Sequence, residues 1–128
     1  MMSLTTLSQL ITGVLLNACA QLLLKGAALS LKEVVENVKW DQYYLARAAI
    51  ELLTNIHLLG GLALYAISVG LWVIVLGKVP VNVAYPMLSV GYVFNAVMAY
   101  LVFDEKLAGV QVVGLIIIII GVVLLNQK

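Results

Sequence analysis

Charged residues are scarce in this sequence, and so are the residues that catalytic sites and covalent cross-links need. Only 10% of the 128 residues are charged, the formal net charge is +1, and there is one histidine and one cysteine. A single cysteine excludes an intrachain disulfide bond, and the near-zero net charge argues against a nucleic-acid partner. We find no metal-ligand cluster, no cofactor motif and no set of acid, base and nucleophile. The sequence therefore predicts no cofactor, no metal and no enzymatic activity.

Apolar residues dominate the composition instead. They make up 64% of the chain, and the mean hydropathy is +1.13. A soluble domain of this length could not bury so much apolar surface. Because about 20 apolar residues in a helix cross a bilayer, we predict an all-α membrane protein with four transmembrane helices in a single domain, 1–128. The predicted spans are 4–25, 56–76, 81–103 and 107–126.

The connection 26–54 holds most of the charge. Apolar residues recur at helical spacing over 31–39 with Lys and Glu on the other side, and a second helical pattern covers 45–53. Such amphipathic pieces are typical of helices that lie at a membrane surface. We predict an interfacial helical segment here, with a solvated loop as the alternative. Thr54 or Asn55 is expected to cap the following span.

Polar residues inside the apolar runs are the candidate functional residues. In the third span, Asn82, Tyr85, Ser89 and Tyr92 fall on one helical stripe, at spacings of 3, 4 and 3. Pro86 lies within the same run and removes one backbone hydrogen bond, which predicts a kink. We expect this stripe to face away from lipid.

The first and second spans carry similar groups. Asn17 and Gln21 lie one turn apart, and Lys25 continues the same edge of the helix. Side-chain amides inside a bilayer are costly unless they face protein or water. These residues either hold helices together by hydrogen bonds alone or line a substrate path. The predicted substrate-binding residues are Asn17, Gln21, Lys25, Tyr65, Ser68, Tyr85, Ser89 and Tyr92.

The fourth span is the most uniformly apolar. Its exceptions form a straight stripe of Gln111, Gly114, Ile118 and Gly121 at spacings of 3, 4 and 3. Small residues on one side of a helix allow a second helix to approach closely in lipid. We predict that this stripe is a dimer interface, and packing within one chain is the alternative.

Several of these features form a recognisable set. Pro80-x-x-x-Ala84-Tyr85 opens the third span, Lys25 ends the first, and two glycines seven residues apart lie in the fourth. Together with the four spans, they resemble the small multidrug resistance family of the drug/metabolite transporter superfamily. The resemblance implies a four-helix subunit that works as an antiparallel dimer.

The sequence departs from that family at one important position. Its drug exporters have a membrane-embedded glutamate in the first helix, which binds either protons or cationic substrate. Asn17 stands at that position and cannot ionise, and no acidic residue lies inside any predicted span. Leu88 replaces the tryptophan of the family's third helix. Coupled exchange of protons for drugs is therefore not the expected activity.

The stretch Val79-Pro80-Val81 through Tyr85-Pro86-Met87-Leu88-Ser89 more closely resembles the lipid-carrier branch of the superfamily. Its members are subunits that move 4-amino-4-deoxy-L-arabinose-phosphoundecaprenol across the bacterial inner membrane. The resemblance implies a multi-pass flippase for a polyprenyl-phosphate-linked sugar, working in membrane lipid as a homodimer or as a heterodimer with a paralogue. The alternatives are an exporter of small cations and a non-transporting subunit of a membrane glycosyltransferase complex.

Overall fold

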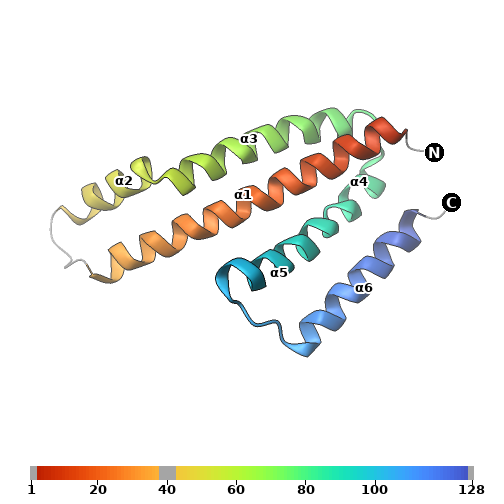
Figure 1. Cartoon of the computed structure of the whole chain (residues 1–128). Helices are drawn as coiled ribbons and strands as arrows, with labels where there is room; N and C mark the ends of the chain where they lie inside the picture. Colours follow the sequence, from red (N-terminus) through yellow and green to blue (C-terminus); the bar gives the residue numbers. More distant parts are fainter. Residues whose placement is uncertain (1–2, 38–42, 127–128) are drawn as a thin grey trace.

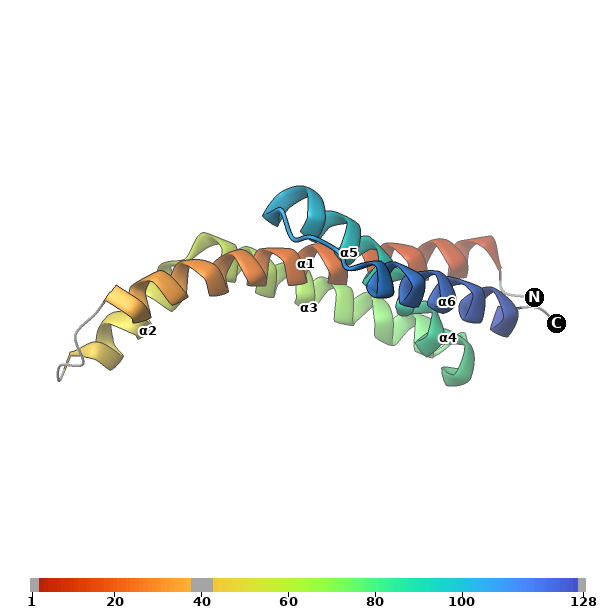
Figure 2. The same ribbon diagram turned by 90° about the horizontal axis from the view of Figure 1, so that it is seen from below.

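The regular elements of the chain are all α-helices in the computed structural model, which describes residues 3–37 and 43–126. Figure 1 shows α3, α1, α5 and α6 side by side in that order, with α4 leading into α5. The view in Figure 2 shows a thin, elongated molecule. The predicted all-α class is confirmed, and the helices form an open row. The elements are α1 (Leu4–Asn37), α2 (Tyr44–Thr54), α3 (Ile56–Leu76), α4 (Val81–Met87), α5 (Ser89–Phe103) and α6 (Gly109–Asn126).

Three helical stretches are long and apolar enough to cross a membrane, namely Leu4–Lys32, Ile56–Leu76 and Val81–Phe103. α6 supplies a shorter apolar stretch, Gly109–Leu125. At 1.5 Å per residue, the 34 residues of α1 reach about 51 Å and the 18 residues of α6 about 27 Å. The helices that form the membrane domain are therefore of very unequal length.

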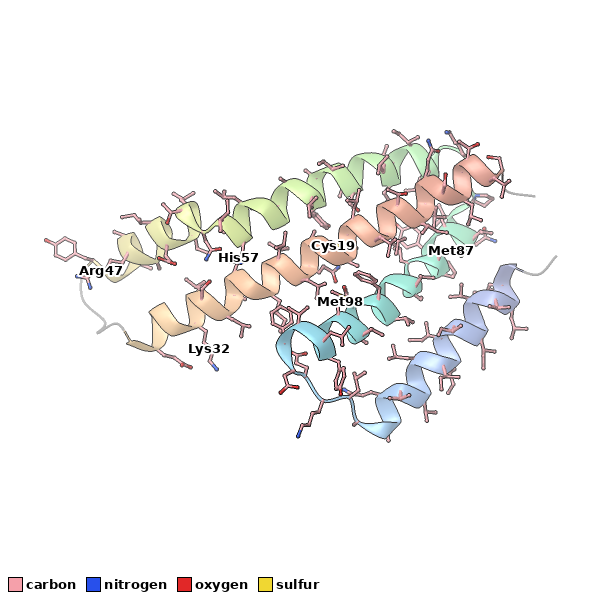
Figure 3. The ribbon with its side chains drawn as sticks, in the orientation of Figure 1. Cys19, Lys32, Arg47, His57, Met87 and Met98 are labelled. Atoms are coloured by element: carbon pink, nitrogen blue, oxygen red, sulfur yellow. The ribbon has the colours of Figure 1, made fainter. Side chains whose placement is uncertain are left out.

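α1 does not end at Lys25, where we predicted the end of the first span, but continues through Gly26 to Asn37. A glycine inside a helix costs only about 1 kcal/mol, and here it lies within contact distance of a residue of another helix. A Cβ on Gly26 would lie 3.6 Å from the ring of His57, which stands at the start of α3 beside α1 (Figure 3). The contact with α3 thus supports a helix that Gly26 alone would weaken.

The predicted helix over 31–39 is therefore the end of α1 as far as Asn37, while 38–39 lie outside the described residues. The helical piece predicted over 45–53 is confirmed as α2, which runs back alongside the end of α1 (Figure 1). Lys32 and Arg47 lie on this hairpin, away from α4, α5 and α6 (Figure 3). Its position in the membrane interface stays a prediction.

Asn55 separates α2 from α3 and joins both to α1. Its Oδ1 accepts hydrogen bonds from the N–H groups of His57 and Leu58, each at 3.0 Å, so it caps α3. Its Nδ2 donates to the Ser30 hydroxyl of α1 at 2.9 Å. Of the two predicted capping residues, Asn55 is the one that caps the helix.

The contact between α1 and α3 is the largest in the molecule. Residues without bulky side chains bring the two helices together. A Cβ on Gly61 would lie 3.0 Å from the Leu24 side chain and 3.1 Å from the carbonyl oxygen of Ala20. A Cβ on Gly13 would lie 3.7 Å from Leu71 Cβ. Close approach of this kind is how helices gain packing energy in lipid, where apolar burial gives no advantage.

The kink predicted at Pro86 takes the form of a one-residue break within the helical stretch Val81–Phe103. α4 ends at Met87, Leu88 forms a turn, and α5 starts at Ser89. The Leu88 N–H donates to the carbonyl of Tyr85 at 3.0 Å, which tightens the last turn of α4. The stripe predicted over 82–92 is therefore divided between two helices.

The Gly61 contact gives a stability prediction. Gly61→Ala places a methyl group against Ala20 O and Leu24, so we expect a loss of about 1–2 kcal/mol in the free energy of unfolding. The matched control is Gly70→Ala on the same helix, where a Cβ meets no described atom within 4 Å. Unfolding of both variants in mixed micelles, followed by circular dichroism, measures the difference. Equal stability of the two variants would contradict this account of the interface.

Candidate functional site

Polar side chains meet where α1 packs against α5, a contact that we name the α1–α5 seam. At one end of it, a Cβ on Gly91 would lie 3.2 Å from the Val14 side chain, so the helices touch closely. Two turns further along α1, Gln21 Oε1 accepts a hydrogen bond of 2.8 Å from Asn95 Nδ2. Asn95 Oδ1 is buried and has no partner among the described residues. Such an unfilled acceptor is costly in a protein interior and marks a place where a further donor would be stabilising.

An ion pair closes the other end of the seam. Lys25 of α1 is paired with Glu105, and its Nζ lies 5.3 Å from the centroid of the Phe103 ring. Asp104 ends α5 in a left-handed conformation with φ of 53°, which Asp tolerates better than most residues. The Glu105 N–H donates to the carbonyl of Ala99 at 3.3 Å. This turn directs the Glu105 side chain back toward α1.

Asn17 is half-buried on α1. By helical spacing it falls between the side of α1 that meets α3, marked by Gly13, and the side that meets α5, marked by Val14 and Gln21. Its side chain makes no hydrogen bond within the described part of the chain. The membrane-crossing stretches contain no Asp or Glu. An amide therefore occupies this position beside the seam without an ionisable acid near it in the membrane.

The two predicted residues of α3 lie in different surroundings. Ser68 is buried, and its hydroxyl donates to the carbonyl of Gly13 on α1 at 2.8 Å. That hydroxyl is used in helix packing. This agrees with the alternative stated above, in which polar residues of the spans only hold helices together by hydrogen bonds. Tyr65 is 46% exposed. The structure thus does not bring Ser68 and Tyr65 to the α1–α5 seam.

The predicted residues of the third span also separate. The Tyr85 ring meets the Trp72 ring edge-on, with centroids 5.7 Å apart, and is half exposed. Tyr92 is half exposed on α5. Ser89 lines an otherwise aliphatic cleft between α5 and α6, in which Ile118 also lies. Of the eight predicted binding residues, only Gln21 and Lys25 make polar contacts in the seam, with Asn17 beside it.

The stripe on α6 is partly occupied within the chain. Ile118 faces α5 in the cleft, and Gln111 Oε1 accepts from the Ala108 N–H at 2.8 Å, so it satisfies a donor at the start of α6. By contrast, a Cβ on Gly114 or Gly121 would meet no described atom within 4 Å. The dimer interface stays a prediction, and the two glycines are the part of it that is open.

Two contributors to the seam were not predicted from the sequence. Asn95 lies three residues after Tyr92 and continues the polar stripe of the third span. Like Asn17 and Gln21, it is a side-chain amide inside an apolar run, so the same reasoning could have predicted it. Glu105 gave no such signal, because its partner Lys25 is 80 residues away in the chain.

Apolar helices of this length, with polar side chains between them, define a multi-pass membrane protein. The profile of the EamA-like transporter family matches residues 2–127. The chain therefore belongs to the EamA-like transporter family.

Individual relatives show which transporter proteins the chain resembles. The chain is 33% identical over 120 residues, 92% of its length and 89% of the relative's, to "Probable 4-amino-4-deoxy-L-arabinose-phosphoundecaprenol flippase subunit ArnF" of Proteus mirabilis. The ArnF protein of Sodalis glossinidius is 34% identical, over 88% of this chain and 84% of its own. A protein of Enterobacter sp. with the same name but designated subunit ArnE is 43% identical over 71 residues, 52% of this chain and 66% of its own. No solved structure matches.

Ser68 and Ser89 provide a test of which hydroxyl is structural. We expect Ser68→Ala to lower the free energy of unfolding by about 1 kcal/mol, because it removes a buried hydrogen bond between α1 and α3. Ser89→Ala is the matched control, since Ser89 is only half-buried in an aliphatic cleft. Thermal unfolding of both in detergent measures the difference. A greater loss in Ser89→Ala would show that the assignment is wrong.

Proposed function

We propose that this protein is a subunit of a flippase that moves a polyprenyl-phosphate-linked sugar across the bacterial inner membrane. The observation that carries the proposal is the α1–α5 seam, which places amides and one lysine along membrane-crossing helices that contain no acidic residue. It is supported by relatives named as flippase subunits for such a lipid, one of which aligns over 92% of this chain.

The physical difficulty of this transport lies in the headgroup. A sugar and a phosphodiester lose their hydration when they enter the hydrocarbon, which is about 30 Å thick, and unpaired polar groups there cost several kcal/mol each. Gln21, Asn95 and Asn17 supply donors and acceptors that replace water around the sugar hydroxyls. The exposed hydrogen bond between Gln21 and Asn95 would be exchanged for bonds to a hydroxyl or amine of the sugar. The polyprenyl tail stays in lipid throughout.

The phosphodiester carries the charge of the headgroup, and Lys25 is suited to bind it. Lys25 lies one helical turn from Gln21 on α1, so the phosphate and the attached sugar can be held by neighbouring side chains. A bond between an ammonium and a phosphate oxygen is charge-assisted and stronger than a neutral hydrogen bond. Lys25 thereby serves as the binding point for the phosphate at one end of the seam.

A second subunit completes the transport path in this proposal. The relatives are named as subunits of two kinds, ArnE and ArnF. The row of helices leaves most large aliphatic side chains of α6 exposed, and Gly114 and Gly121 have open space beside them. An antiparallel partner, either a second copy or a paralogue, packs there and supplies the remaining wall.

The rival function is that of a non-transporting subunit, in which polar contacts serve only to pack helices. Ser68 is an example of such a contact. Export of small cations has less support, because the membrane-crossing stretches hold no acidic residue that could exchange a proton for a cation. A direct transport assay separates these functions.

We expect the purified protein, alone or with its paralogue, to speed the exposure of a fluorescent polyprenyl-phosphate sugar to an impermeant quencher outside liposomes. Replacing Asn17, Gln21 or Lys25 by Ala should slow the rate about tenfold or more, since a lost polar contact of about 1.4 kcal/mol has that effect. Ser8→Ala, which alters an exposed hydroxyl outside the seam, is the control. Activity equal to protein-free liposomes in both preparations would favour the non-transporting subunit.

A further inference from the structure

We propose that Glu105 occupies the phosphate-binding position of Lys25 in the resting protein, and that the phosphodiester of the lipid-linked sugar displaces it. The inference rests on the proposed function and identifies where the substrate's charge binds. It also assigns a role to an acidic residue just outside the membrane-crossing stretches. Five observations support it.

The distribution of positive charge singles out Lys25. The membrane-crossing stretches contain two Lys or Arg residues, Lys25 and the terminal Lys32. Lys32 lies on the part of α1 beyond the other membrane helices and forms a pair with Glu36 of the same helix at 3.6 Å (Figure 3). Among the cationic residues that the structure describes, only Lys25 lies beside the polar side chains of the α1–α5 seam. An anionic headgroup that enters the α1–α5 seam therefore meets this ammonium.

The pair that Lys25 forms is open to exchange. The side chains of Lys25 and Glu105 are 39% and 46% exposed, so the rest of the chain does not enclose them and a ligand can reach both. Ion pairs at this degree of exposure add little to stability, so breaking one costs little. A carboxylate and a phosphodiester each carry one negative charge and present two oxygens, so either can accept from the same ammonium.

Phe103 holds the ammonium when its anion changes. Lys25 Nζ lies 5.3 Å from the centroid of the Phe103 ring, within the range of a cation–π contact. This contact involves the face of an uncharged ring and so does not depend on Glu105. Lys25 keeps its position at the end of the seam while one anion replaces the other.

The backbone around Glu105 allows it to leave. Glu105 lies in the non-helical connection 104–108, directly after the left-handed Asp104, and α6 begins only at Gly109. Its N–H makes a long hydrogen bond of 3.3 Å to Ala99. A rotation of the Glu105 side chain, or a small change in this turn, removes the carboxylate without unwinding α5 or α6.

The neighbouring contacts fit a phosphate followed by a sugar. Gln21 is four residues before Lys25, on the same side of α1, and it is bonded to Asn95 across the seam. A phosphodiester at Lys25 therefore places its sugar toward two amides. Glu105 occupies only the position of the charge and leaves these amides to each other.

The experiment measures binding rather than transport. Purified full-length protein in detergent is titrated with a short-chain polyprenyl-phosphate sugar, and the dissociation constant is read by microscale thermophoresis. Glu105→Gln removes the competing carboxylate but keeps the size of the side chain. We expect binding about fivefold tighter, because the phosphodiester no longer has to break the exposed ion pair between Lys25 and Glu105. Lys25→Gln should weaken binding by at least that factor.

Glu36→Gln is the matched control, because it removes the same charge from the ion pair between Lys32 and Glu36 on α1 and should leave binding unchanged. If Glu105→Gln fails to fold, Glu105→Asp decides, since its shorter side chain should compete less and give an intermediate gain. The uncharged polyprenol should bind equally to the wild-type protein and to Glu105→Gln. Unchanged or weaker sugar-lipid binding in Glu105→Gln, or an equal gain in Glu36→Gln, would overturn the proposal.

Inorganic phosphate distinguishes the two sources of the anion. We expect it to compete with the lipid only weakly, because it makes no contact with the amides or with the lipid surroundings. If it binds as tightly as the lipid and responds equally to Glu105→Gln, the lipid is not the occupant. Failure of the proposed function is recognised separately: the liposomes then show no transport, although the binding of the lipid still responds to Glu105→Gln.

Discussion

The close contact between α1 and α3 determines how the rest of the molecule is arranged. In lipid no hydrophobic effect draws two helices together, so they adhere only where their backbones approach closely. Gly61 of α3 permits this approach, and further along the same contact the hydroxyl of Ser68 reaches the Gly13 carbonyl of α1. With one side of α1 occupied by α3, its next side is left to meet α5. The polar seam thus depends on packing that itself involves few polar groups.

Residues of similar chemistry have different roles on the two sides of α1. Ser68 faces a neighbouring backbone, and its one donor is fully used by it. Gln21 and Asn95 form a pair that leaves an acceptor unfilled, and Lys25 holds an anion that is half exposed. Polar groups whose bonding capacity is exhausted stabilise a structure, whereas those with capacity left over can bind a ligand. Whether the hydrogen-bonding capacity of a polar group is used up, more than its residue type, therefore distinguishes packing residues from binding residues here.

Much of the fold could be predicted from the sequence because apolar length is a local property. The bounds predicted over 56–76 coincide with those of α3, and the prediction over 81–103 coincides with the helical stretch Val81–Phe103, in which the kink predicted at Pro86 appears as a break at Leu88. The continuation of α1 past Gly26 could not be predicted, since it depends on His57 and Asn55 of a helix that follows later in the chain. Asn95 could have been recognised by the rule applied to Asn17. Glu105 could not, because only the tertiary structure brings it to Lys25.

The unequal lengths of the helices have a consequence for the surrounding lipid. The apolar stretch of α6 covers only Gly109–Leu125, whereas that of α1 covers the 29 residues Leu4–Lys32, so no single bilayer thickness suits both. A membrane adapts to such mismatch by thinning beside a short helix and by tilting a long one. A short helix such as α6 thus favours a thinner hydrocarbon layer beside it, of which a polar headgroup would have less to cross. The thickness of the bilayer beside α6 would then affect the free-energy barrier to moving the headgroup across, and with it the rate of transport.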